Sequence, residues 1–232
     1  MILSSAENSS LQWEKQYGYI EYNVEGNAAE NRGYTGGIVG FTSKTHDMLL
    51  LAQAYTKATP NNPLARFLPA LKKADGTSSA AGLGSAFVGA WKKAAATTGF
   101  KVAQREAADR MYLRPAVVAA QADGLGRLGQ FIYYDAMVMH GPGTDPLSFD
   151  GMRAAALRTA KPPAKGGNQT TYLHAFLDVR IRAMQAEEAH RDISRISAAQ
   201  RVWLRSGNLR LALPLSWSVY SDRYSITPMG GC

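Results

Sequence analysis

The sequence predicts a mainly α-helical fold. Apolar residues recur at intervals of three and four along most of the 232-residue chain, which is the spacing of one face of an α-helix. Short stretches rich in glycine, proline or small polar residues separate these segments. No internal repeat is visible, and the length suits a single domain over residues 1–232, made of two lobes around one cleft.

The first predicted helix starts near the chain's N-terminus. A serine at position 4 or 5 can cap it, and it runs through Leu11 and Trp13 toward Tyr22. Residues 26–40 are rich in glycine and asparagine, so they predict a loop with a short strand at residues 38–39. This strand is the small β element that the sequence predicts.

Further helices follow from the apolar spacing and from residues that start or stop a helix. The stretch 76–84 is a loop of small residues and is predicted to be a hinge between lobes. The strongly apolar segment 125–139 is predicted to be a buried central helix, which the glycines and proline at 141–143 end. The predicted helices cover residues 45–55, 63–71, 125–139, 151–159, 171–189 and 197–205, and others pass through Trp91, Val102, Met111 and Val117.

Composition excludes several classes of protein. Hydrophobic residues make up 46% of the chain and charged residues 19%, a balance typical of globular domains. No apolar run is long enough to span a membrane, and the N-terminus lacks the regions of a signal peptide. Cys232 has no partner for an internal disulfide, and the four histidines lack metal-binding spacing. These features argue against a metal enzyme.

The formal net charge of +8 favours an anionic partner such as nucleic acid. The lysines and arginines are spread along the chain, however, and no block of five or more like charges occurs. A solvated basic face explains such a distribution equally well.

Glu7 is the first candidate for chemistry. It lies four residues from Leu3 and four from Leu11, so the three side chains share one face of the predicted helix. Ionising a carboxyl group on the buried side of a helix is costly, which favours the protonated form that a general acid requires. The alternative is an exposed glutamate at a frayed helix start.

Asp135 and Arg180 are a second pair of candidates. Asp135 lies within an apolar segment, and Arg180 shares a helical face with Phe176 and Met184. A buried acid and a buried base usually occur because they pair, so we expect an internal ion pair. Its role is either functional or purely structural.

The segment 30–37 is the densest cluster of glycine and polar residues. Glycines allow tight turns and close approach to a ligand. The guanidinium group of Arg32 can donate several hydrogen bonds, the ring of Tyr34 offers a stacking surface, and Thr35 offers a hydroxyl group. The chain lacks the motifs of nucleotide-binding loops and of serine hydrolases. Two separated carboxylates, one on a helix and one on a loop, therefore predict glycoside hydrolysis.

Taken together, these residues resemble the chitosanases of glycoside hydrolase family 46. The resemblance extends from about residue 4 to about residue 224, and its motifs occur in the family's order. They are residues 4–13 (SSAENSSLQW), 32–37 (RGYTGG), 45–49 (THDML), 68–73 (LPALKK), 129–131 (GQF), 133–135 (YYD), 139–143 (MHGPG), 171–173 (TYL), 176–178 (FLD) and 200–202 (QRV).

The resemblance implies a lysozyme-like, mainly α fold with two lobes flanking a substrate cleft. It implies a secreted, monomeric endo-hydrolase that cleaves the β-1,4 linkages of chitosan and its oligosaccharides by inversion, without a cofactor and without nucleic-acid or membrane partners. A signal peptide would then precede Met1.

The resemblance also implies roles for individual residues. Glu7 matches the general acid, and Thr35 matches the threonine that holds the attacking water. A charge network that the family couples to the general acid is matched by Asp135, Arg180 and Arg195. Positions that contact sugar units are matched by Tyr19, Arg32, Asp47 and Glu187, and a position that lines the cleft is matched by His140.

Three positions depart from the family pattern. The general base of the family is an aspartate two residues before the RGYT motif, and in this chain that position is Glu30, after a loop about five residues longer. Counting residues forward from the acid, as in shorter family members, reaches Glu25 instead. We favour Glu30 because it preserves the family's sequence spacing to Arg32 and Thr35, which must share the water with the base. Thr42 replaces a common cysteine, and Arg191 replaces an acidic cleft residue.

Three other functions remain open on the sequence alone. A lysozyme or chitinase would act on N-acetylated sugars, a basic DNA-binding protein would bind with a steep salt dependence, and a sugar-binding module would bind without turnover. Because chitosan is a polycation, a chitosanase of charge +8 also requires a locally acidic cleft, for which Asp47, Glu187, Glu25 and Glu30 are the candidates.

Overall fold

The computed structural model describes residues 1–24, 32–187 and 191–228. Helices dominate these residues, so the mainly α class predicted from the sequence is confirmed. The chain divides into two compact units, Met1–Met111 and Tyr112–Cys232, each with its own buried core. None of the helices described is long and apolar enough to cross a membrane.

The first unit combines helices with a small antiparallel sheet of strand order β1-β2-β3. Thr35, at the centre of β2, lies opposite Glu21 in β1 and Thr42 in β3. The elements, in chain order, are α1 (Ile2–Glu7), η1 (Trp13–Gly18), β1 (Ile20–Tyr22), β2 (Tyr34–Gly36), β3 (Phe41–Thr42), α2 (Asp47–Ala58), η3 (Ala65–Phe67), α3 (Leu68–Ala74), α4 (Gly84–Ala95) and α5 (Thr98–Ala108).

Aromatic rings form the core of the first unit. Phe87, Trp91 and Phe100 are fully buried on α4 and α5, and the rings of Trp91 and Phe100 meet edge-on with centroids 5.0 Å apart. Tyr34 of β2 packs against Phe87 at 5.3 Å. Because buried rings contribute large apolar areas, this cluster fixes the sheet to α4.

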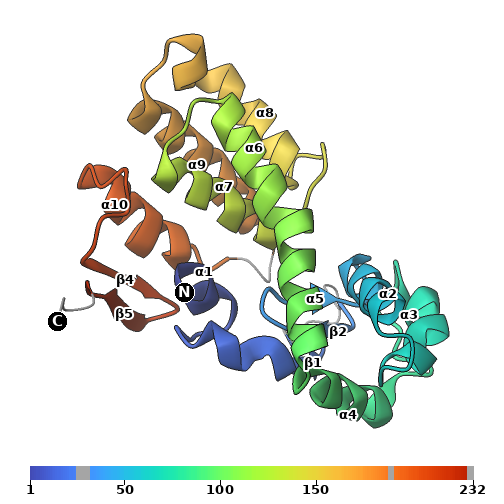
Figure 1. Cartoon of the computed structure of the whole chain (residues 1–232). Helices are drawn as coiled ribbons and strands as arrows, with labels where there is room; N and C mark the ends of the chain where they lie inside the picture. Colours follow the sequence, from blue (N-terminus) through green and yellow to red (C-terminus); the bar gives the residue numbers. More distant parts are fainter. Residues whose placement is uncertain (25–31, 188–190, 229–232) are drawn as a thin grey trace. The chain divides into compact units, whose positions relative to one another are not determined.

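The second unit is built around α7. Helices α6, α8 and α9 all pack against α7, as Figure 1 shows. Near the C-terminus, the π-helical turn η7 packs against strand β4 of the hairpin β4–β5, and α10 packs against α9. The π-helical turn η4 (Asp109–Leu113) spans the division between the units. The other elements are α6 (Arg114–Ala122), α7 (Arg127–His140), α8 (Phe149–Thr159), η5 (Pro163–Lys165), α9 (Gln169–Ala186), η7 (Ile196–Gln200), α10 (Arg201–Arg205), β4 (Leu215–Val219) and β5 (Asp222–Ile226).

A buried polar cluster joins α7 to its neighbours in the second unit. Asp123 accepts two hydrogen bonds of 2.7 Å from Arg153 on α8 and one of 2.7 Å from the hydroxyl of Tyr133 on α7. Burial, together with the nearby Tyr172 and Asp123, raises the pKa of Tyr133. The hydroxyl therefore stays protonated and acts as a donor inside the core.

The predicted first helix is wrong in both its start and its length. Helix α1 ends at Glu7, and a separate 3-10 helix, η1, follows from Trp13 to Gly18. Ser9 adopts a left-handed backbone conformation with φ of 46°, and the Ser10 hydroxyl accepts the N–H of Gln12. Serine side chains that bond to nearby backbone compete with helix continuation.

The β elements also differ from the prediction. Residues 38–39 form a turn, and the strands lie on either side of it as β2 and β3. The hairpin β4–β5 was not predicted, although Leu215, Trp217 and Val219 alternate with serines in the pattern of a half-buried strand.

The loop at residues 76–84 is not a hinge between the two units, because the elements before and after it both belong to the first unit. Two hydrogen bonds hold it there. The N–H of Gly76 donates to the carbonyl of Lys44 (2.9 Å), and the hydroxyl of Tyr22 donates to the carbonyl of Ser78 (3.0 Å).

Candidate active site

Glu7 is the last residue of α1 and is half-buried, whereas the four residues before it are buried. The side-chain amide of Asn8 donates to the carbonyl of Ile38 (3.3 Å), which ties the end of α1 to the turn between β2 and β3. Leu3 lies on the same helix, but Leu11 lies beyond its end. The helical face predicted for Glu7 is therefore shared with Leu3 alone.

Glu7 and Thr35 both lie close to Gly40. Its backbone is left-handed, with φ of 69°, and a Cβ atom at this position would lie 3.5 Å from Cγ2 of Thr35 and 3.9 Å from Oε2 of Glu7. The two candidate side chains thus approach the same point beside Gly40.

The backbone around Thr35 is fixed by a buried glutamine. Gln104 on α5 is fully buried; its side-chain oxygen accepts the N–H of Ile38 (3.1 Å) and its amide donates to the carbonyl of Tyr17 (2.9 Å). Within β2, Tyr34 and Gly36 face the core, so Thr35 lies on the opposite, half-exposed face. Strand pairing and Gln104 therefore fix the backbone that carries Thr35.

Asp47 occupies the first turn of α2 and is 7% exposed. Its Oδ1 accepts the N–H groups of Thr42 and Met48, both at 2.9 Å, and the hydroxyl of Thr45 at 3.1 Å. Hydrogen bonds to an ionised carboxylate stabilise the charged form. Neither Thr45 nor Asp47 is the N-cap; His46 occupies that position with φ of 74°.

Tyr19 and Arg32 also lie in the first unit. The hydroxyl of Tyr19 donates to the carboxylate of Glu21 (3.2 Å), and its carbonyl accepts the N–H of Gly37 (2.8 Å). Arg32 is half-buried two residues before β2. Both candidates for the general base, Glu30 and Glu25, lie outside the described residues.

The expected ion pair between Asp135 and Arg180 is present in the second unit, and both side chains are buried. The carboxylate of Asp135 accepts from Arg180 at 2.6 Å, from Arg195 at 2.8 Å and from Gln200 at 2.7 Å. Helices α7 and α9 and the π-helical region thus converge on one carboxylate. A coupling of this network to Glu7 stays a prediction.

The arginines determine the ionisation of Asp135. Burial by itself raises the pKa of this carboxyl group, but the positive charges and hydrogen bonds of Arg195 and Arg180 outweigh burial and lower the pKa to about 2. Asp135 is therefore ionised at any pH near neutrality, and it compensates the two buried cations.

His140 links this network to Glu187. The Nε of Arg180 donates to Nε2 of His140 (3.4 Å), and Nδ1 of His140 lies 3.8 Å from the Glu187 carboxylate at the end of α9. The His140 side chain is fully buried, whereas that of Glu187 is 27% exposed. Glu187 can therefore face a ligand while its position is supported from the core.

Two contributors to these arrangements, Gln104 and Gln200, were not found from the sequence. A glutamine in a helix usually lies in solvent, and nothing in the local sequence marks these two as buried. Among the described residues, no group of three histidine, cysteine, aspartate or glutamate side chains is placed to hold a metal ion.

The family model for "Glycosyl hydrolase family 46" matches residues 1–215 of the chain. The chain belongs to glycosyl hydrolase family 46. It is therefore a glycoside hydrolase, and the resemblance identified from the sequence motifs is confirmed.

Relatives and solved structures agree with this family assignment. A chitosanase from Streptomyces sp. (strain N174) is 55% identical over 225 residues, which cover 97% of this chain and 79% of the relative. The structure described as "co-crystal structure of chitosanase OU01 with substrate" matches with a TM-score of 0.93 and 52% identity over 97% of this chain and 93% of that one. A complex of a Gynuella sunshinyii family 46 chitosanase with chitotetraose matches with a TM-score of 0.88 and 28% identity, covering 98% and 95% of the two chains.

Proposed function

We propose that this family 46 enzyme is an endo-chitosanase, which hydrolyses β-1,4 linkages between glucosamine units of chitosan by inversion. Support comes from the relatives, which are named chitosanases and two of which were solved with a substrate or with chitotetraose. The observation that carries the mechanism is the approach of Glu7 and Thr35 to one point beside Gly40. Because polymeric chitosan does not cross a membrane, the enzyme acts outside the cell.

In this mechanism Glu7 is the general acid. Glu7 is half-buried at the end of α1, after four buried residues, so its carboxyl group is accessible to a ligand. Protonated Glu7 donates to the glycosidic oxygen. Thr35, held by its strand, positions the water that attacks the anomeric carbon.

Glu30 is the general base. It takes a proton from the attacking water on the face of the sugar opposite to Glu7, and an inverting pair of carboxyl groups requires a separation of roughly 6.5–9.5 Å to leave room for that water. Glu30 lies five residues before Thr35 in the chain. This short connection favours Glu30 over Glu25, because base and threonine must share one water molecule.

Charge supports a cationic sugar as the substrate. The carboxylate of Asp47 accepts three hydrogen bonds. The carboxylate of Glu187 is partly exposed and lies 3.8 Å from Nδ1 of the buried His140. Anionic side chains of this kind attract the free amines of glucosamine, which are positively charged below neutral pH. Tyr19 and Arg32 complete the substrate-binding residues of this proposal.

The identity of the base is tested by Glu30→Gln and Glu25→Gln. Glutamine keeps the size of glutamate but cannot accept the proton, so we expect Glu30→Gln to lower kcat about 10²–10⁴-fold while Glu25→Gln keeps most of it. Reducing ends released from highly deacetylated chitosan give the rates, and each variant is the size-matched control for the other.

The opposite ranking, with Glu25→Gln inactive and Glu30→Gln active, moves the base to position 25. If both variants keep the parent's rate, neither glutamate is the base. If the parent releases no reducing ends, chitosan is not the substrate and the proposed function fails.

A further inference from the structure

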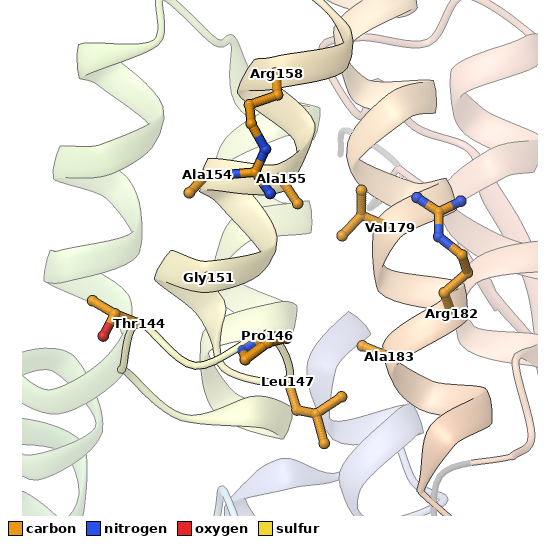
Figure 2. A pocket seen from close by; sticks show the side chains of 10 residues that line it. All are labelled: Thr144, Pro146, Leu147, Gly151, Ala154, Ala155, Arg158, Val179, Arg182 and Ala183. Carbon is orange, nitrogen blue, oxygen red and sulfur yellow. The ribbon is translucent and has the colours of Figure 1, made fainter.

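A pocket of about 380 Å³ lies in the second unit between α8 and α9, and none of the candidate active-site residues lines it. One wall is formed by the loop from Thr144 to Leu147, and the floor by Ala155 and Val179 (Figure 2). Its volume falls in the range of small-molecule sites, which begins at about 300 Å³.

The loop wall is preformed. The carboxylate of Asp145 accepts the N–H groups of Leu147 (3.0 Å) and Ser148 (3.1 Å) and the Ser148 hydroxyl. The loop also lies directly on α8, because a Cβ atom at Gly151 would collide with the carbonyl of Asp145. Asp145 is thus occupied by its own loop, and it does not line the pocket.

Two arginines give the pocket its charge. Arg158 on α8 and Arg182 on α9 both line it, and Figure 2 shows their side chains lying along it from opposite sides with Ala155 and Val179 between them. Within the described part of the chain, neither guanidinium has a hydrogen-bond or ion-pair partner. Other arginines of this unit do, such as Arg153 with Asp123 and Arg180 with Asp135.

These features define the chemistry of a ligand. Two cations that face one pocket without an anion repel each other, and a guanidinium matches a carboxylate with two parallel hydrogen bonds. The floor of alanine and valine side chains offers apolar contact and no hydrogen bond. A ligand must therefore carry a negative group and a compact apolar body.

We propose that this pocket is a binding site for a small amphipathic carboxylate, such as a medium-chain alkanoate. The carboxylate lies between Arg158 and Arg182, and the alkyl chain covers Ala155 and Val179. The site is separate from the chitosan-hydrolysing residues, and its ligand has the opposite charge to chitosan.

Titration of the full chain with octanoate, followed by calorimetry and by amide chemical shifts, tests the site. We expect saturable binding with a Kd of about 1 mM or below and shift changes confined to α8, α9 and the 144–147 loop. Arg158→Gln and Arg182→Gln should each weaken binding about tenfold, as expected for loss of a charge-assisted hydrogen bond. Ala155→Leu, which fills the floor and leaves the charges unchanged, should abolish binding.

The matched control is Arg127→Gln, which removes an exposed arginine of the same unit outside the pocket and should leave the Kd unchanged. Acetate and octan-1-ol, which each carry one half of the ligand's chemistry, should bind at least about tenfold more weakly than octanoate. The proposal is overturned if octanoate shows no saturable binding, if both pocket arginine variants bind like the parent, or if acetate binds as tightly as octanoate.

Discussion

Glu7→Gln is expected to lower kcat on chitosan by about 10²–10⁴-fold, the usual contribution of a general acid. Glutamine occupies the same space but has no proton to give to the leaving oxygen. Glu7 is only half-buried at the end of a short helix, so the thermal midpoint should stay within a few degrees of the parent's. Reducing-end assays at saturating chitosan, together with a melting curve, measure both quantities.

A substrate with a good leaving group separates loss of the acid from a general defect. An aryl glycoside of a glucosamine oligosaccharide needs little protonation of its leaving oxygen, so Glu7→Gln should regain a large part of the parent's rate on it. Glu14→Gln changes an exposed glutamate of the same unit and should behave as the parent does. A Glu7→Gln protein with near-parental kcat on chitosan would remove Glu7 from the role of acid.

Asp135→Ala is expected to lower the free energy of unfolding by about 3–5 kcal/mol, the usual loss when one member of a buried ion pair is removed. Arg180 is completely buried and Arg195 nearly so, and alanine would leave both cations uncompensated. Gln200 would lose its carboxylate acceptor as well. Urea unfolding followed by circular dichroism gives the difference.

Asp178→Ala is the matched control, because Asp178 also pairs with an arginine, Arg201, but its side chain is 55% exposed. Exposed pairs contribute about 0–1 kcal/mol. Equal losses for the two variants would show that the Asp135 network does not act as a buried pair.

The pH dependence of stability tests the same network. The pKa of Asp135 in the folded protein is about 2, below the ordinary value of 3.8. A lowered pKa stabilises the folded state above pH 3.8, and this contribution, on the order of 2 kcal/mol, is lost as the pH falls from 3.8 toward 2. The parent should therefore lose more stability over this interval than Asp135→Ala does.

Long, strongly periodic segments could be predicted from the sequence. The apolar run around Asp135 became α7 and the segment containing Phe176 and Arg180 became α9, and the ion pair between them followed from the cost of burying either charge alone. In both cases the local pattern and the tertiary packing require the same structure.

Short elements that depend on distant residues could not be predicted. Strands β2 and β3 have three and two residues, and a fully buried glutamine 66 residues away holds the turn between them. The first helix ends early because serine side chains and a left-handed Ser9 favour another backbone path. The approach of Glu7 to Thr35 depends on this turn, so only the family motifs, and not local periodicity, indicated that the two residues act together.

The anomeric form of the first product tests the central proposal most directly. Proton NMR of the parent enzyme with a glucosamine oligosaccharide, recorded before the new reducing ends mutarotate, distinguishes the two anomers. Inversion at a β-1,4 linkage by Glu7 and Glu30 predicts that the α-anomer appears first. The β-anomer as first product, or no new reducing end at all, would contradict the proposal.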